Sequence, residues 1–162
     1  HFDTVMNFIS QYKNKIAVHF SRADFMLNGQ ENSEHFGPLQ IKFQDNSYLT
    51  LEENGDAESI TVSTNPIVFR NQNQPDAEYW TEIVLDNKPN WSEFLNSKLI
   101  GISLLQYIDQ TTVGCRLHFD ISKSITFYNY YDDAKVAFEN DKLLSSFVDY
   151  EKLSWVDLIE IN

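Results

Sequence analysis

Residues 39–62 read LQIKFQDNSYLTLEENGDAESITV, and residues 115–138 read CRLHFDISKSITFYNYYDDAKVAF. The two stretches align without a gap at an offset of 76 residues, and their apolar positions coincide. In both, apolar and polar residues alternate between short turn signals, which is typical of strands with one buried face. Identity is low, so the shared pattern carries the comparison. The pattern predicts three antiparallel strands, present twice in the chain.

The segments that flank these stretches repeat as well. Residues 80–85 (WTEIVL) resemble residues 155–159 (WVDLI), so a strand led by tryptophan closes each half. Upstream, the apolar pattern of residues 8–16 resembles that of residues 91–99. The order of segments is the same in both halves, apart from a loop at residues 28–37 that is rich in turn-forming residues.

We therefore expect one compact domain, residues 1–162, that arose by internal duplication. Unit one spans residues 3–85 and unit two spans residues 86–161. A single unit of about 76 residues would be marginally stable alone, because small domains bury a smaller fraction of their surface. We expect the two units to pack together about a pseudo-twofold axis.

Each unit is expected to open with a helix. Val5, Phe8, Ile9 and Tyr12 follow the i, i+3, i+4, i+7 spacing of an apolar helical stripe, and residues 89–95 carry a similar pattern. The predicted fold class is therefore α+β, with two tandem pseudo-symmetric units. Each unit would be a helix packed on a curled, mainly antiparallel sheet of four to five strands.

The chain is strongly acidic, with 24 Asp and Glu residues against 12 Lys and Arg and a net charge of −12. This balance argues against nucleic acid or an anionic membrane as a partner, because phosphate binding needs clustered cations. It favours a basic protein partner, since opposite fields speed encounter. The bland alternative is that the acidity only keeps the protein soluble.

The one cysteine, Cys115, rules out an intramolecular disulfide and fits a reducing, cytoplasmic location. It lies in an apolar alternation, so we expect a buried hydrophobic role for it. No stretch approaches the roughly 20 apolar residues of a membrane span, which predicts a soluble protein.

No motif in the sequence carries recognisable chemistry. A nucleophile elbow and a phosphate loop are absent, and His35 stands alone rather than in a zinc spacing. His118 lies on a predicted strand, where a partly exposed structural histidine is the plainer interpretation. We predict no catalytic residue, no metal and no cofactor, and the question of enzymatic activity leans towards none.

Two turns at matched positions of the repeat stand out. If Phe127 points inward, Tyr128 and Tyr130 point outward, and exposed tyrosines beside acids are typical of binding surfaces. The alternative is that a second layer covers these tyrosines. The equivalent turn of the first unit is an acidic run. The candidate partner-binding residues are Glu52, Glu53, Asp56, Glu58, Tyr128, Tyr130, Tyr131, Asp132 and Asp133.

In size, acidity and lack of a catalytic motif the chain resembles the small acidic immunity proteins with which bacteria neutralise toxins. The leading hypothesis is a non-enzymatic acidic protein-binding module of this type, which inhibits a basic toxin partner. One rival is a small-molecule binding protein or enzyme with its pocket at the junction of the repeats, lined by Trp80, Trp155 and Tyr107. Another is a structural subunit that self-associates through a sheet edge, for example as a homodimer.

Overall fold

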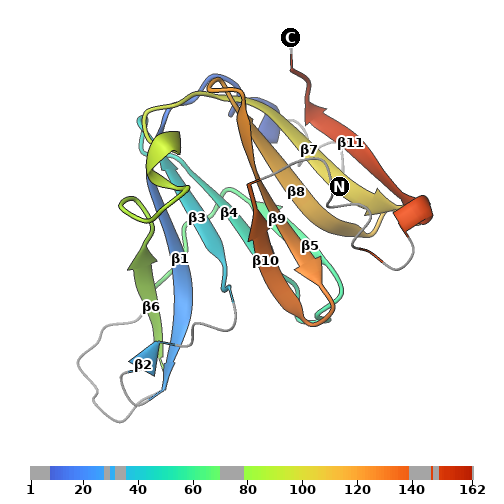
Figure 1. Cartoon of the computed structure of the whole chain (residues 1–162), viewed down its shortest axis with the longest axis horizontal. Coiled ribbons are helices and arrows are strands. Elements are labelled where there is room, and N and C mark those ends of the chain that lie inside the picture. The colour runs from blue at the N-terminus through green and yellow to red at the C-terminus, as the bar shows by residue number, and fades with distance from the viewer. Residues whose placement is uncertain are drawn as a thin grey trace.

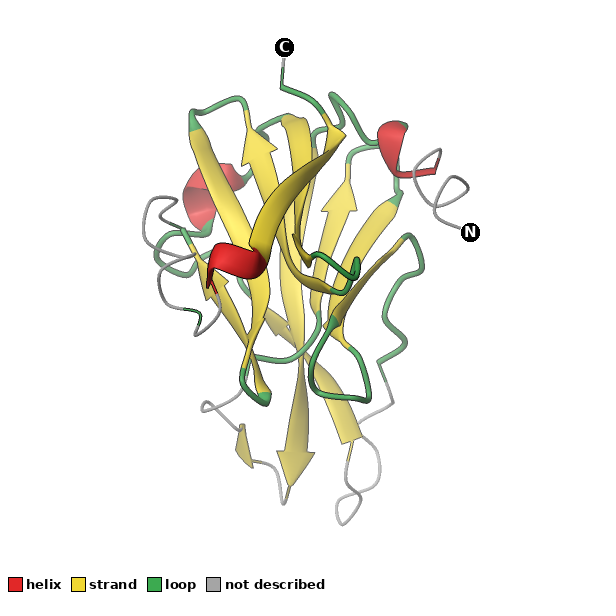
Figure 2. Cartoon of the chain, turned by 90° about the vertical axis from the view of Figure 1, so that its right-hand side faces the viewer, coloured by secondary structure: helices red, strands yellow, loops and turns green. Residues whose placement is uncertain are grey.

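A computed structural model describes most of the chain, namely residues 8–27, 30–31, 36–69, 79–138, 147 and 150–161. These residues form eleven strands arranged in two antiparallel sheets (Figure 1). The helical parts among them are single turns near the ends of the strands (Figure 2). The described structure is thus almost entirely β.

The first sheet is built from the N-terminal half of the chain. Its strands are β1 (Ala17–Leu27), β2 (Gln30–Glu31), β3 (Leu39–Phe43), β4 (Tyr48–Glu53), β5 (Ile60–Ser63) and β6 (Tyr79–Val84). Across the sheet the order is β6, β1, β3, β4, β5. The short β2 pairs with the far end of β1, beyond the stretch that β3 covers.

The second sheet is built from the C-terminal half. Its strands are β7 (Leu99–Tyr107), β8 (Thr112–Phe119), β9 (Lys123–Tyr130), β10 (Asp133–Ala137) and β11 (Leu153–Ile159). The order is β11, β7, β8, β9, β10. In each sheet the last strand of that half pairs with the first, and the other strands follow in chain order. The two sheets therefore have the same topology.

The strand registers repeat together with the strand order. Leu39 faces Leu51 in the β3–β4 ladder, and 76 residues later Cys115 faces Phe127 in the β8–β9 ladder. The other three pairs of the β3–β4 ladder recur at the same offset. Both first strands also carry an irregularity two residues after they begin, at 17–19 and at 99–101. An ancestral duplication is our inference from this repetition.

The ladders also shift one match made from the sequence. Trp80 pairs with Phe25 at the end of β1, and the equivalent position on β7 pairs with Leu153. Trp155 instead lies opposite Leu105, two residues further along. Matching the two tryptophans in the sequence was therefore wrong by two residues. The match followed the tryptophan side chains, whereas equivalent positions are set by the register of strand pairing.

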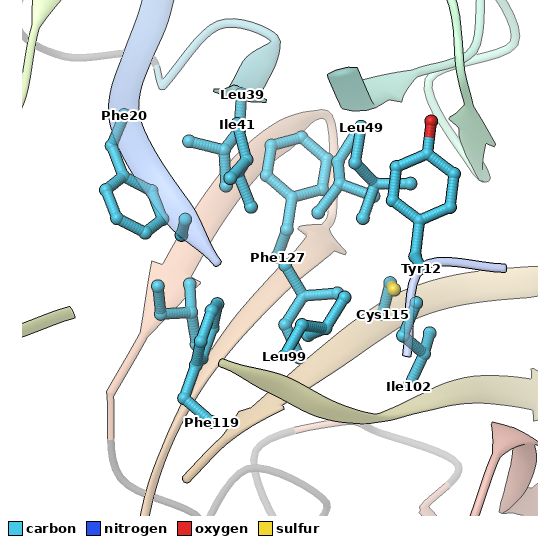
Figure 3. Close-up of a cluster of buried hydrophobic side chains, with 14 of the residues drawn as sticks. Tyr12, Phe20, Leu39, Ile41, Leu49, Leu99, Ile102, Cys115, Phe119 and Phe127 are labelled. Atoms are coloured by element: carbon cyan, nitrogen blue, oxygen red, sulfur yellow. The ribbon is translucent and has the colours of Figure 1, made fainter. Parts of the chain in front are cut away.

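The core lies between the two sheets. Alternate residues point to opposite faces of a strand, so each sheet contributes one apolar face. Fully buried side chains from both sheets meet in one cluster (Figure 3). It includes Phe20, Leu39, Ile41, Leu49 and Leu51 from the first sheet, and Leu99, Ile102, Cys115, Leu117, Ile125 and Phe127 from the second. Each large side chain buried there stabilises the fold by roughly 1.5–3 kcal/mol.

The predicted α+β class is wrong, because no helix packs on either sheet in the described part of the chain. In the first unit residues 8–10 form a single helical turn, and Val5 of the predicted stripe lies outside the described residues. In the second unit the predicted helix is the three-residue 3₁₀ turn η1 (Ser92–Phe94). The main apolar faces of the two sheets cover each other instead.

The apolar residues at helical spacing belong to short turns whose side chains enter the core between the sheets. Ile9 and Tyr12 are buried in the core cluster, and so are Trp91 and Phe94 of the second unit. A single turn suffices to point two side chains at spacing i, i+3 into the core. Each helical turn is followed within a few residues by an asparagine with positive φ, Asn14 (70°) and Asn96 (65°), a region that asparagine tolerates.

A histidine fastens β6 to β1. His19 on β1 contacts Asp86 through Nδ1 at 2.6 Å and Glu82 through Nε2 at 3.0 Å, and Asp86 also accepts the N–H of Phe20 at 2.7 Å. Burial lowers the pKa of His19. The hydrogen bonds and negative charges of the two carboxylates raise it by more, so the pKa lies above the usual histidine value.

This arrangement predicts a pH-dependent contribution to stability. A raised pKa gives stability that is complete below about pH 6.5 and is lost as the pH rises through the folded value. The free energy of unfolding of His19→Gln should therefore fall below wild type by at most about 1 kcal/mol at pH 6, and the gap should shrink towards pH 9. Denaturant titrations at several pH values measure this difference in the free energy of unfolding.

Lys88→Gln, which removes an exposed positive charge, is the control, and its free energy of unfolding should follow that of wild type in parallel as the pH changes. A gap that widens with pH contradicts the assignment.

Candidate binding groove

The two divergent turns lie together at one end of the sandwich. The Asn129 side chain on β9 donates through Nδ2 to Glu53 Oε2 at 2.7 Å and to the carbonyl oxygen of Ala57 at 2.9 Å. Asn129 follows Glu53 by 76 residues, so the bond joins two equivalent positions of the repeat. The asparagine amide thereby ties the β9–β10 turn to the β4–β5 turn (Figure 1).

An open groove of about 760 Å³ lies beside this contact. Its walls come from the two turns, from the β7–β8 hairpin and from residues next to the 3₁₀ turn η3 (Tyr150–Lys152). The lining residues are Ala57, Glu58, Tyr107, Ile108, Asp109, Thr111, Val113, Asn129, Tyr130, Tyr131, Asp132, Phe147 and Lys152. The volume lies in the range of known ligand pockets, but the groove is open to solvent.

Apolar side chains give the groove exposed hydrophobic surface. Ile108 is 87% exposed and Tyr131 is 65% exposed. Tyr130 stacks edge-on against Tyr131 with ring centroids 4.6 Å apart, and against Phe147 at 6.0 Å. Large apolar side chains this exposed within one groove are typical of an interaction site.

Carboxylates supply the charge of the groove. Glu58 and Asp132 belong to its lining and are both exposed. Behind them, burial raises the pKa of Glu53, the hydrogen bond from Asn129 lowers it, and the charges of nearby aspartates raise it. The net result is a raised pKa, with burial as the largest cause and the neighbouring negative charges adding to it. The aspartates concerned are Asp133, Asp132 and Asp56.

The predicted residues of the first unit are placed unevenly. Glu58 lines the groove and Glu53 lies behind it, whereas Glu52 is exposed on β4 and is not part of the lining. Asp56 is exposed, but its carboxylate accepts the backbone N–H groups of Glu58 and Ser59. These bonds lower the pKa of Asp56 and give it a role in shaping the turn.

The predicted residues of the second unit divide similarly. Tyr130, Tyr131 and Asp132 line the groove. Tyr128 is half-buried and packs against Phe147 with ring centroids 6.1 Å apart. Asp133 begins β10 and contributes to the negative charge around Glu53. Whether any of these residues binds a partner stays a prediction.

Sequence reasoning missed one wall of the groove. Ile108, Asp109 and Thr111 come from the β7–β8 hairpin, and Phe147 and Lys152 come from the segment before β11. The signal was an isoleucine beside the turn-forming Asp109, whose carboxylate accepts the N–H of Thr111. Of the residues proposed for a junction pocket, Tyr107 lines the groove and Trp155 does not; the side chain of Trp80 lies outside the description.

A serine, a histidine and an aspartate also meet on the outer face of the second sheet. Ser103 Oγ donates to Asp157 Oδ1 at 2.7 Å and lies 3.1 Å from His118 Nε2. The serine proton is engaged by the aspartate, so the histidine donates to the serine and cannot remove its proton. Nucleophilic catalysis requires the histidine between the other two. The burial of His118 and the charge of Arg116 lower the pKa of His118.

Burial raises the pKa of the Cys115 thiol to about 12, so this cysteine is not a nucleophile. Among the described residues, no group of three His, Cys, Asp or Glu side chains is arranged to hold a metal ion. No helix in the described ranges is long and apolar enough to cross a membrane.

The crowding of carboxylates at Glu53 is directly measurable. Asp132→Asn removes one of the charges that raise the pKa of Glu53, so the pKa of Glu53 should fall towards its ordinary value. A carbon-detected NMR titration of the side-chain carboxyl groups measures the pKa of Glu53 in each protein. Glu160→Gln, an exposed acid on the far side of β11, should leave the titration of Glu53 unchanged. If Glu53 titrates identically in all three proteins, the two turns do not share one electrostatic site.

Comparison of this chain with protein-family models, with curated proteins and with solved structures found no match. The groove is therefore interpreted from its own chemistry.

Proposed function

We propose that the chain is a non-enzymatic, acidic protein-binding module that docks a basic protein partner at the groove, in the manner of an immunity-type inhibitor of a basic toxin. The observation that carries the proposal is the convergence of the two turns. Exposed apolar side chains and carboxylates from both halves of the chain flank one groove there. The single buried thiol, Cys115, agrees with the cytoplasmic location that forms part of this proposal.

Charge supports a basic rather than an acidic partner. The net charge of −12 gives the whole molecule a negative field that speeds the approach of a cationic protein. Among the described residues of the lining, Glu58, Asp109 and Asp132 are acidic and Lys152 is the one lysine. The exposed Tyr131 next to the half-buried Tyr130 adds aromatic surface, which is enriched at protein interfaces.

A small-molecule site is the second candidate, because the groove has a suitable volume and contains Tyr107, as the junction-pocket hypothesis expected. The open shape of the groove distinguishes the protein-binding candidate from the small-molecule candidate. A small ligand needs most of its surface covered to bind tightly, whereas a protein partner brings its own cover to an open groove. Saturable binding of a neutral aromatic fragment that is lost in Tyr107→Ala would favour the small-molecule site.

The proposal is tested with a nona-arginine peptide as the cationic probe. Glu52→Gln, Glu58→Gln and Asp132→Asn combined neutralise three exposed acids, two in the lining and one on the neighbouring strand β4. The affinity for the peptide should fall about tenfold at low salt, because three surface ion pairs are worth roughly 0.5 kcal/mol each. Calorimetry or fluorescence anisotropy at several salt concentrations measures it, and the salt dependence should flatten.

The matched control removes the same charge elsewhere. Glu82→Gln, Glu93→Gln and Glu160→Gln combined neutralise three exposed acids outside the groove lining. This variant should bind the peptide within about twofold of wild type, since only distant charges change. Equal losses in both variants would mean that net charge alone attracts the peptide, and the groove would then have no role as a docking site.

A further inference from the structure

We infer that the groove receives an arginine side chain of the partner, with its aliphatic stem against Ile108 and Tyr131 and its guanidinium among the carboxylates of Glu58 and Asp132. The inference rests on the proposed function and deepens it, because it names the side chain that the partner presents.

The apolar walls require a ligand group with apolar surface. Ile108 on the β7–β8 hairpin and Tyr131 on the β9–β10 turn are among the most exposed large apolar side chains in the described part of the chain. A compact ion that kept its water shell would leave both uncovered. A long side chain with an aliphatic stem covers them while its charged head stays at the wet rim.

The carboxylates require that the same group be cationic. Glu58 and Asp132 come from different turns, and Asp109 comes from a third element of the lining. A purely apolar side chain would strip water from these carboxylates without replacing their hydrogen bonds, which is costly. A cation supplies donors and charge together, so an amphipathic cation satisfies walls and rim at once.

The protein already uses its aromatic rings in this manner. The ammonium group of Lys135 lies 4.9 Å from the ring centroid of Tyr130, and the guanidinium of Arg116 lies 4.1 Å from that of Trp155. Tyr131 contacts Tyr130 edge-on and is largely exposed to solvent. The groove thus presents an aromatic ring beside carboxylates, an environment that attracts cations.

The backbone at Tyr131 adds an independent reason to assign a role to this ring. Its φ of 55° lies in the left-handed region, where a bulky residue is unfavourable and asparagine or glycine would be easier to accommodate. The tight turn sets this conformation, as other turns do at Gln110 and Ser122, so the backbone makes an aromatic side chain costly here. The aromatic side chain at this position therefore opposes local stability.

Arginine fits better than lysine. A guanidinium is planar, is more weakly hydrated than an ammonium and presents several donors, so it stacks on a ring while bonding carboxylates on more than one side. The carboxylates of Glu58, Asp109 and Asp132 surround the groove from three elements. A point charge would engage them one at a time.

The test compares nona-arginine with nona-lysine on the intact chain. Wild type should prefer nona-arginine by about fivefold, the size of a cation–π contact at an exposed site. Tyr131→Asn should bring the ratio of the two affinities close to one, and Tyr131→Phe, which keeps the ring, should retain the preference for nona-arginine.

Thermal unfolding supplies the second readout. Tyr131→Asn should melt at the same or a higher temperature than wild type, because asparagine tolerates the left-handed backbone.

The outcomes separate the two levels of the proposal. If both peptides bind at the groove but with equal affinity, or if Tyr131→Asn keeps the arginine preference, the arginine inference is wrong and the acidic docking site stands. If neither peptide binds wild type at low salt, the proposed function itself fails. If Tyr131→Asn loses binding only because it unfolds at a lower temperature, the ring is structural and the inference fails as well.

Discussion

The need to bury one apolar face of each sheet controls the rest of the structure. Alternation along β3 and β8 gives each sheet an apolar face that is buried in the main core. No long helix covers either apolar face in the described part of the chain, so the two sheets cover each other. The single turns that carry Ile9, Tyr12, Trp91 and Phe94 then close the end of the core between them.

Packing two similar sheets face to face also explains where the groove lies. The equivalent turns after β4 and β9 arrive at the same end of the sandwich, where Glu53 and Asn129 meet. These turns bear less of the core, so their residues are freer to differ between the units than the residues of the ladders are. The first turn, residues 54–59, carries Asp56 and Glu58, and the second, residues 131–132, is a tight turn with the exposed Tyr131. The groove between them combines both chemistries.

The sequence predicted the strands well because period-two alternation directly reflects burial. The β3–β4 and β8–β9 ladders repeat at the offset read from the sequence, and four of the nine candidate residues line the groove, namely Glu58, Tyr130, Tyr131 and Asp132. The helices were predicted wrongly because apolar residues at helical spacing have the same sequence pattern in a long helix that covers a sheet and in a single turn that points two side chains into the core. The wall around Ile108 was missed. Alternate turns of one antiparallel sheet lie at the same end, so the β7–β8 hairpin stands near the β9–β10 turn, but the alternation pattern does not show which side chains border a groove.

The central claim is that the two turns contact each other and so create the groove. A double-mutant cycle on the free energy of unfolding, with Glu53→Ala, Asn129→Ala and the double variant, tests it directly. The 2.7 Å hydrogen bond between these side chains predicts a coupling energy of about 1 kcal/mol. The coupling should persist at moderate salt, because part of it is a hydrogen bond in a half-buried site. Additive effects of the two single variants, with no coupling, would show that the turns do not meet and would contradict the account.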